Sequence, residues 1–285
     1  MSALTWLLEK DCFEDSEPRL IDSIKKAGQA YELVEYIPVI QETGWSNMNH
    51  EKGPGPFVFH GSINLGKVIG RYDPYLNLFC TWKNYKCSLY HSIPYIQRLL
   101  LNDCGIFYPY GGLKQILSEY VKSGATKVFI RPDGGAKSFS GTIVELGNSA
   151  IDKFFYQCEL YEQIKSEDLC LVAPIRDDII AEYRCIVINN KAITCSRYKL
   201  GGFEFKTRPQ NGFTCDNVDN PYITDYVNHF LENCNYRPDA CFTVDVALTN
   251  KTKPEIIEFN SFSCAGMYGC NTDKIVKAMG DMLCS

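Results

Sequence analysis

Three oxygen-bearing side chains near the C-terminal end of the chain could hold a divalent cation. Asp245 lies in the apolar run 243–247, and Glu258 and Asn260 lie in a second such run, 255–260. Apolar and β-branched residues around single acidic groups predict a β-strand in each run. Side chains alternate along a strand, so Glu258 and Asn260 share one face, where Asp245 could meet them. These ligands suit Mg²⁺ rather than zinc, and the alternative is an edge strand with solvated carboxylates.

A glycine-containing turn lies between two further predicted strands. Residues 127–131 and 137–145 have strand patterns, and residues 132–136 between them contain two glycines. Glycines let backbone N–H groups approach an anion, and Arg131 and Lys137 add positive charge on either side. This segment is either a phosphate-binding turn or a plain surface hairpin.

A charged pair lies in a third strand-like region. The sequence 169–188 predicts an apolar strand, a short polar connection and a second strand that carries Glu182 and Arg184. Both side chains share a strand face. Buried charges need partners, so the pair is either a structural ion pair or a site for a charged ligand.

In this order the segments resemble the ATP-grasp superfamily over about residues 110–285. Residues 129–132 resemble its nucleotide-binding strand, with Arg-Pro in place of the usual Lys-Pro. Residues 171–175 resemble the hinge that lies along the adenine, and residues 181–184 resemble the Glu-x-Arg strand. The acid and the Glu-x-Asn pattern near the C-terminal end match the metal-binding residues of the superfamily.

Two arginines and one lysine further narrow the resemblance. Arg131, Arg184 and Lys137 are similar to the residues after which one clade, common in bacteriophages, is named. The resemblance implies that Arg131 and Lys137 bind phosphate oxygens of ATP. Arg184 would grip the acyl phosphate or the transferring phosphoryl group, and Glu182 would orient Arg184.

The remaining nucleotide contacts follow from the same resemblance. It implies that Asp245, Glu258 and Asn260 hold one or two Mg²⁺ ions, or Mn²⁺, on the ATP phosphates. The hinge lacks the acidic residue that many relatives use for the ribose, and Asp177 and Asp178 are the candidates. The residues implied along the adenine are Val172, Ala173, Pro174 and Ile175.

Residues after the Glu-x-Asn pattern are candidates for substrate contacts. Gly266 could offer a backbone N–H to the acceptor, and Tyr268 could shape the pocket. The alternative is a tight connection into a final helix that Asn271 or Thr272 caps. Arg197 could receive an anionic substrate, or it could belong to a solvated basic loop.

The resemblance implies an ATP-dependent carboxylate–amine ligase. Such an enzyme forms an acyl phosphate, then an amide or peptide bond, and releases ADP and phosphate. Its partners would be ATP, a carboxylate substrate and an amine acceptor, including a peptide or protein. Phosphoryl transfer to a hydroxyl or to water, and a non-catalytic nucleotide-binding regulatory protein, are the alternatives.

The predicted fold class is α/β (α+β). We expect a preATP-grasp-like domain over residues 1–110, then a two-lobed ATP-grasp module over 111–285. The lobes of the module are expected at 111–172 and 173–285, with MgATP bound between them.

The N-terminal domain has weaker patterns. They predict a helix over 21–30, a strand over 31–40 and a strand that runs into a turn over 57–62. Within the last segment, His60-Gly61-Ser62 resembles a Gly-Ser turn of the phage-type clade. Helix N–H groups at this turn could bind an acceptor anion, or the turn could be an ordinary strand-to-helix connection.

Composition is consistent with this interpretation. The chain has 285 residues, of which 45% are hydrophobic, and a net charge of −5, which argues against general nucleic-acid binding. No apolar run reaches the length of about 18–20 residues that spans a bilayer. The 14 cysteines form no C-x-x-C pair, which is typical of thiols in a reducing compartment. We therefore expect the protein in the cytoplasm, or in the host cytoplasm if a phage encodes it.

Overall fold

The chain divides into two compact units, which we describe separately. The computed structural model describes residues 4–14, 16–35, 56–72, 77–160, 164–201, 203–204, 219–250 and 253–284. Unit 1 consists of Met1–Thr81, Ile179–Pro254 and Glu258–Ser285, and unit 2 consists of Trp82–Asp178 and Glu255–Ile257. Unit 1 is therefore assembled from three separate segments of the chain.

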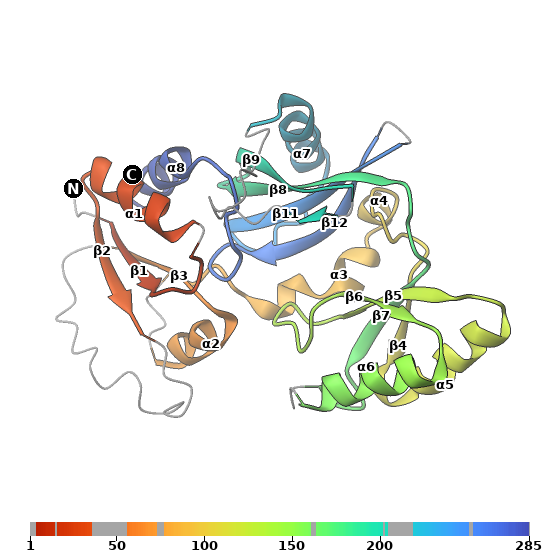
Figure 1. Ribbon diagram of the computed structural model, residues 1–285. Coiled ribbons are helices and arrows are strands. Elements are labelled where there is room, and N and C mark those ends of the chain that lie inside the picture. The colour runs from red at the N-terminus through yellow and green to blue at the C-terminus, as the bar shows by residue number, and fades with distance from the viewer. Residues whose placement is uncertain are drawn as a thin grey trace. The chain divides into compact units, whose positions relative to one another are not determined.

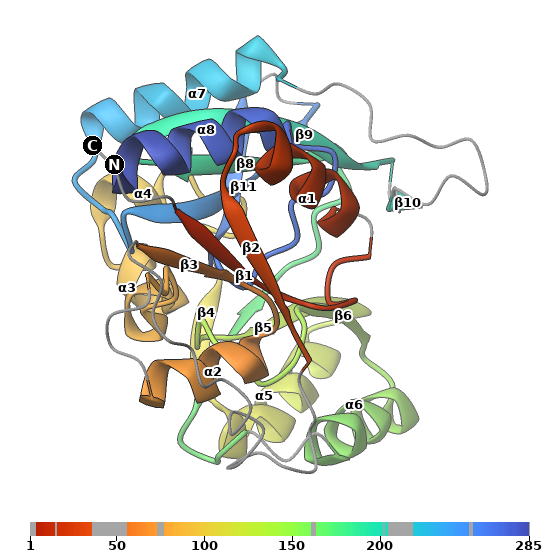
Figure 2. The same cartoon turned by 90° about the vertical axis from the view of Figure 1, so that its left-hand side faces the viewer.

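The first part of unit 1 is a three-stranded parallel sheet with strand order β2-β1-β3. Its strands and helices are β1 (Thr5–Glu9), α1 (Glu17–Lys26), β2 (Ala30–Val34), β3 (Phe57–His60) and α2 (Ile63–Tyr72). Figure 2 shows α1 beside this sheet. Pro18 in the first turn favours the start of α1. Gly28, at φ +67°, allows the chain to leave the helix and enter β2.

The second part of unit 1 is a five-stranded sheet with strand order β10-β9-β8-β11-β12 (Figure 1). The neighbours of β8 on both sides, β9 and β11, run antiparallel to it. Its strands are β8 (Ile179–Ile188), β9 (Lys191–Leu200), β10 (Phe203–Glu204), β11 (Cys241–Thr249) and β12 (Pro254–Ser261), with helices α7 (Pro221–Asn233) and α8 (Thr272–Leu283).

One hydrophobic core joins the two sheets of unit 1. It contains Trp6 from β1, Ile186 from β8, Ile275 from α8, and Phe262, which follows β12; all four are almost completely buried. The side chain of Asn271 accepts a hydrogen bond from the N–H of Lys274 and so caps α8. The expected C-terminal helix and its cap are confirmed.

Unit 2 is built on a four-stranded antiparallel sheet with strand order β4-β7-β5-β6. Its core includes Leu113, Leu117, Ile130 and Val172. Its elements are a 3₁₀ turn η2 (Trp82–Tyr85), α3 (Cys87–His91), α4 (Pro94–Gln97), β4 (Ile106–Pro109), α5 (Tyr110–Lys122), β5 (Lys127–Pro132), β6 (Thr142–Glu145), α6 (Asn148–Leu160) and β7 (Leu169–Ala173).

The predicted α/β fold class is confirmed, and most predicted strands are present. The boundaries differ at three places. Strand β6 begins at Thr142 rather than at 137, and α1 spans Glu17–Lys26 rather than 21–30. Strand β2 ends at Val34, and residues 36–40 of the predicted strand lie outside the described residues. The division at 110 and at 172 stays a prediction.

No helix in the described part of the chain is long and apolar enough to cross a membrane. The cysteines among the described residues are free thiols, and Cys170, Cys185, Cys195 and Cys241 are buried in strands.

Candidate active site

A buried ion pair lies at the centre of the five-stranded sheet of unit 1. Arg184 on β8 is directly opposite Asp245 on β11 in the strand register. The Nε and Nη2 groups of Arg184 donate to the two carboxylate oxygens at 2.8 and 2.6 Å. Only 7% of Arg184 and 2% of Asp245 are exposed. Burial alone would lower the pKa of Arg184, but the Asp245 carboxylate raises it well above its ordinary value.

Two further groups hold the guanidinium of Arg184. Its Nη1 donates to the backbone carbonyl of Gly266 at 2.8 Å. The ring of Tyr268 lies 4.8 Å from the guanidinium carbon and stacks on Tyr198 with a centroid distance of 4.7 Å. One N–H on each terminal nitrogen of Arg184 is not used by these bonds. Arg184 is therefore fixed in place and still has donors for an anion.

Glu182 does not contact Arg184 directly, contrary to the orienting role expected for it. Glu182 is opposite Lys199 in the register and accepts from Lys199 Nζ at 2.7 Å and from the Tyr198 hydroxyl at 2.8 Å. Tyr198 lies in turn beside Arg184, with 5.9 Å between its ring centroid and the guanidinium carbon. Glu182 therefore acts on Arg184 only through the ring of Tyr198.

The three predicted metal ligands converge. The side-chain N–H₂ of Asn260 donates to Glu258 Oε1 at 2.9 Å and to Asp245 Oδ2 at 3.2 Å. The predicted shared face of Glu258 and Asn260 is thus confirmed. In the assigned amide orientation, the positive end of the Asn260 dipole points to where the two carboxylates meet.

This donor set fits Mg²⁺ or Mn²⁺. Two carboxylates and one amide are hard oxygen donors within hydrogen-bonding distance of one another, and their combined charge favours a cation. Among the described residues there is no cluster of three or more His, Cys, Asp or Glu side chains that could hold a metal. A metal at this position would therefore depend on the amide of Asn260 as well as on Asp245 and Glu258.

Unit 2 carries the predicted phosphate-binding residues. Arg131 on β5 is 5% exposed and donates to the Tyr90 hydroxyl at 3.4 Å. Lys137 follows the turn with φ 41° and is half-buried, and its N–H donates to the Gly134 carbonyl at 3.1 Å. The buried Asp133 carboxylate accepts from the Ser88 N–H at 2.6 Å, which fixes the start of the turn.

The predicted hinge follows β7 in unit 2. Val172 and Ala173 are buried in β7, and the chain then leaves the sheet at Pro174 and Ile175. The proposed ribose ligand, Asp178, accepts two hydrogen bonds from Arg176, at 2.8 and 2.9 Å.

Arg176 also connects the hinge to a distant part of the chain. It donates to Glu255 Oε2 at 2.7 Å and to the Leu101 carbonyl at 2.8 Å. Asp178 belongs to this ion-pair network, and its role in ribose binding stays a prediction.

The turn at the end of β3 already contains a carboxylate of the protein. The N–H of Ser62 donates to Glu9 Oε2, and the N–H of Gly61 donates to the Ser263 carbonyl. Burial lowers the pKa of His60 to about 4, so its ring is neutral at physiological pH, with Nε2 3.2 Å from the Ala265 carbonyl. The proposed anion site at this turn is thus already satisfied by Glu9.

Two of the residues that hold Arg184 were not predicted from the sequence. Tyr198 and Lys199 were seen only as part of a basic segment, because strand register decides which residues oppose each other. Arg19 of α1, which holds the carbonyls of Tyr268 and Cys270, carries no local signal. Arg197 lies on β9 opposite Tyr183, and its substrate role stays a prediction.

Together, the sheet that bears Arg184 and the converging metal ligands and the sheet of unit 2 with its glycine turn define an ATP-grasp protein. The family model that matches residues 113–278 is described as an ATP-grasp domain, family 2 of its clade. The chain therefore belongs to this family. No curated protein sequence matches the chain.

Solved structures with the same fold cover nearly the whole chain at low sequence identity. The D-cycloserine synthetase DcsG has a TM-score of 0.64 and 10% identity and covers 98% of this chain and 99% of its own. The D-alanyl-alanine synthetase A from Vibrio cholerae O1 biovar eltor has a TM-score of 0.60 and 11% identity, with 100% of both chains covered. The macrocyclase MdnC from Microcystis aeruginosa, bound with precursor peptide MdnA, has a TM-score of 0.52 and 10% identity, with 99% of both chains covered.

Proposed function

We propose that this protein is an ATP-dependent carboxylate–amine ligase that releases ADP and phosphate. The observation that carries the proposal is the buried Arg184–Asp245 pair next to Glu258 and Asn260. Acyl-phosphate chemistry needs positive charge held in place and a metal near the phosphates, rather than a covalent nucleophile. Unit 1 supplies both kinds of group at one end of its central sheet.

Each residue of this set has a distinct task. Arg184 stabilises negative charge on the transferring phosphoryl group or the acyl phosphate through its two remaining N–H donors. Asp245, Glu258 and Asn260 hold Mg²⁺ or Mn²⁺, which when bound neutralises phosphate charge. Because Asp245 also binds Arg184, it fixes the metal and the guanidinium relative to each other.

On unit 2, we assign phosphate binding to Arg131 and Lys137. Burial of Arg131 and its bond to Tyr90 hold the guanidinium in one position, as recognition of phosphate oxygens requires. Val172 and Ala173, with Pro174 and Ile175, are assigned to the adenine. The order of these segments in a chain of the ATP-grasp family supports the assignment.

The titles of the structural neighbours support the reaction class. Two of them are synthetases, and the third is a macrocyclase bound with a precursor peptide. We therefore include peptides and proteins, together with free amino acids, among the carboxylate and amine substrates. The cytoplasmic location and the phage origin stay predictions.

Calorimetry of ATP binding with and without Mg²⁺ tests the proposal. The wild type should bind ATP more tightly with Mg²⁺, and Glu258→Gln should lose this metal dependence because one carboxylate ligand is gone. Glu232→Gln is the matched control, since Glu232 is an exposed residue of α7. Absence of ATP binding in the wild type would refute the proposal.

A screen of carboxylate and amine pairs for ADP release then tests the reaction. Mass spectrometry should find a product that joins both substrates with loss of water. A phosphorylated substrate without joining would instead indicate a kinase-like reaction, and nucleotide binding without any turnover would indicate a regulatory protein.

A further inference from the structure

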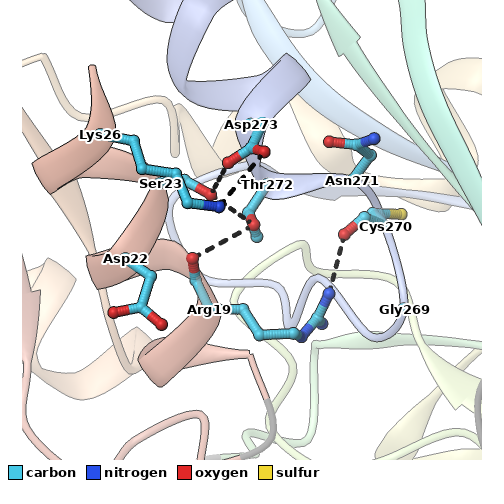
Figure 3. Close-up of a pocket in the computed structure, with 9 residues that line it drawn as sticks. All are labelled: Arg19, Asp22, Ser23, Lys26, Gly269, Cys270, Asn271, Thr272 and Asp273. Carbon is cyan, nitrogen blue, oxygen red and sulfur yellow. Dashed lines mark hydrogen bonds and ion pairs between the residues drawn. The ribbon is translucent and has the colours of Figure 1, made fainter.

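The first helix reaches the residues around Arg184 through one side chain. Arg19 of α1 donates from Nη1 to the carbonyl of Cys270 at 3.1 Å and from Nη2 to the carbonyl of Tyr268. Figure 3 shows the Arg19 guanidinium beneath the Cys270 carbonyl. Both carbonyls belong to residues 262–271, which connect β12 to α8 and which we call the 262–271 loop.

The 262–271 loop also holds Arg184. The Gly266 carbonyl accepts from Arg184, and the Tyr268 ring covers the guanidinium. Tyr268 has φ 47°, in the left-handed region that a residue with a side chain seldom adopts. Such a backbone persists only where surrounding contacts hold it, and the hydrogen bond from Arg19 to the Tyr268 carbonyl is one of these contacts.

We propose that Arg19 is a positioning residue that fixes Arg184 by way of the 262–271 loop. Its effect on catalysis rests on the function proposed above, whereas its effect on the loop does not. The planar guanidinium of Arg19 binds two carbonyls of the loop at once, which a single ammonium group does less well. Loss of Arg19 would release Tyr268 and, with it, one wall of the Arg184 site.

The packing of α1 against α8 does not depend on Arg19. The Ser23 hydroxyl donates to Thr272 Oγ1 at 2.8 Å, and Leu20 and Ile24 are buried in the same core as Ile275 of α8. These contacts stay intact when Arg19 is replaced. The Arg19→Ala variant should therefore fold, with the change confined to the loop.

A solvent-accessible pocket beside Arg19 makes chemical rescue feasible. Its volume is about 340 Å³, and its lining includes Arg19, Lys26 and Cys270 (Figure 3). Free guanidinium ion is small enough to enter it and reach the carbonyls that Arg19 binds. Lys26 lies on the same helix and at the same pocket but pairs with Asp273 at 3.6 Å, so Lys26→Ala is a matched control.

Hydrogen exchange of the 262–271 loop, measured by mass spectrometry, tests the proposal. In Arg19→Ala the amides of the loop should exchange at least about tenfold faster, and in Lys26→Ala they should stay within about twofold of the wild type. Millimolar guanidinium chloride, far below denaturing concentrations, should restore part of the protection in Arg19→Ala. Arg19→Lys, which keeps the charge, should lie between the wild type and Arg19→Ala.

The outcomes separate this proposal from the proposed function. Unchanged exchange of the loop in folded Arg19→Ala, or in Arg19→Lys if the alanine variant does not fold, would overturn the positioning role. Equal effects of guanidinium on Arg19→Ala and Lys26→Ala would also overturn it. Failure of the wild type to bind MgATP would refute the ligase alone. Where the wild type turns over, Arg19→Ala should lower kcat and leave KM for ATP within about twofold, because Arg184 acts on the transferring group.

Discussion

Breaking the Arg184–Asp245 pair should cost far more stability than its replacement by apolar residues. Arg184→Met leaves a carboxylate that is 2% exposed without its guanidinium, and Asp245→Leu leaves a guanidinium that is 7% exposed without its carboxylate. Removal of one partner of a buried ion pair costs about 3–5 kcal/mol, because the other charge stays buried. The double variant removes both charges and should cost less than either single variant.

The coupling free energy from this double-mutant cycle should therefore be at least about 3 kcal/mol. Urea denaturation without added metal measures the free energy of unfolding, so that Asp245 is not a metal ligand in any variant. Lys114 and Asp152 provide the control cycle, since they are also 2.6 Å apart but their side chains are 64% and 62% exposed. Their coupling should be below about 1 kcal/mol.

Two results would refute the reasoning about the buried pair. One is a cost below about 1 kcal/mol for each single variant, which would show that the charges are solvated in the folded protein. The other is additivity of the two changes, which would show that Arg184 and Asp245 are stabilised by separate partners.

Two further predictions concern His60 and the glycine turn. The pKa of His60 is about 4 in the folded protein, below its ordinary value near 6.5, so the unfolded chain binds the proton first as pH falls. Its contribution to stability should therefore fall by about 2 kcal/mol from pH 6.5 to 5, a slope that denaturation curves should show reduced in His60→Gln. In unit 2, a Cβ at Gly135 would overlap Tyr85 Cβ, whereas a Cβ at Gly134 would have nothing within 4 Å. Thermal denaturation should show a cost of about 1–3 kcal/mol for Gly135→Ala and within about 0.5 kcal/mol for Gly134→Ala; equal costs would contradict the close packing.

Local pattern was sufficient to predict the metal-ligand strands. Alternation placed Glu258 and Asn260 on one face of β12, and the structure shows their side chains hydrogen-bonded. Apolar neighbours of Asp245 predicted a buried strand, and the structure has β11 there. These features depend only on the two-residue period of a strand, which the sequence contains directly.

Strand register was not accessible in this way. Glu182 and Arg184 share a face, but residues two apart on one strand are separated by nearly 7 Å, whereas residues directly opposite on neighbouring strands are about 5 Å apart. The cross-strand partners therefore win: Lys199 for Glu182, and Asp245 for Arg184. The predicted orientation of Arg184 by Glu182 was wrong for this reason.

Long-range contacts through loops were also beyond local pattern. Arg19 and the carbonyls that it binds are 249 and 251 residues apart in the chain. Only the packing of α1 beside α8 brings them together, and a solvated arginine on an amphipathic helix has the same local pattern.

The segmented construction of unit 1 has a consequence for synthesis on the ribosome. Residues of the β2-β1-β3 sheet leave the ribosome early, yet their core is completed by Ile275 and Met279 of α8, near the end of the chain. The sheet of unit 2 is made from one continuous stretch, so its strands can pair while translation continues. The newly made N-terminal sheet must therefore wait, with Trp6 and Ile24 uncovered, until the last helix emerges. Chaperone dependence should be concentrated in that interval.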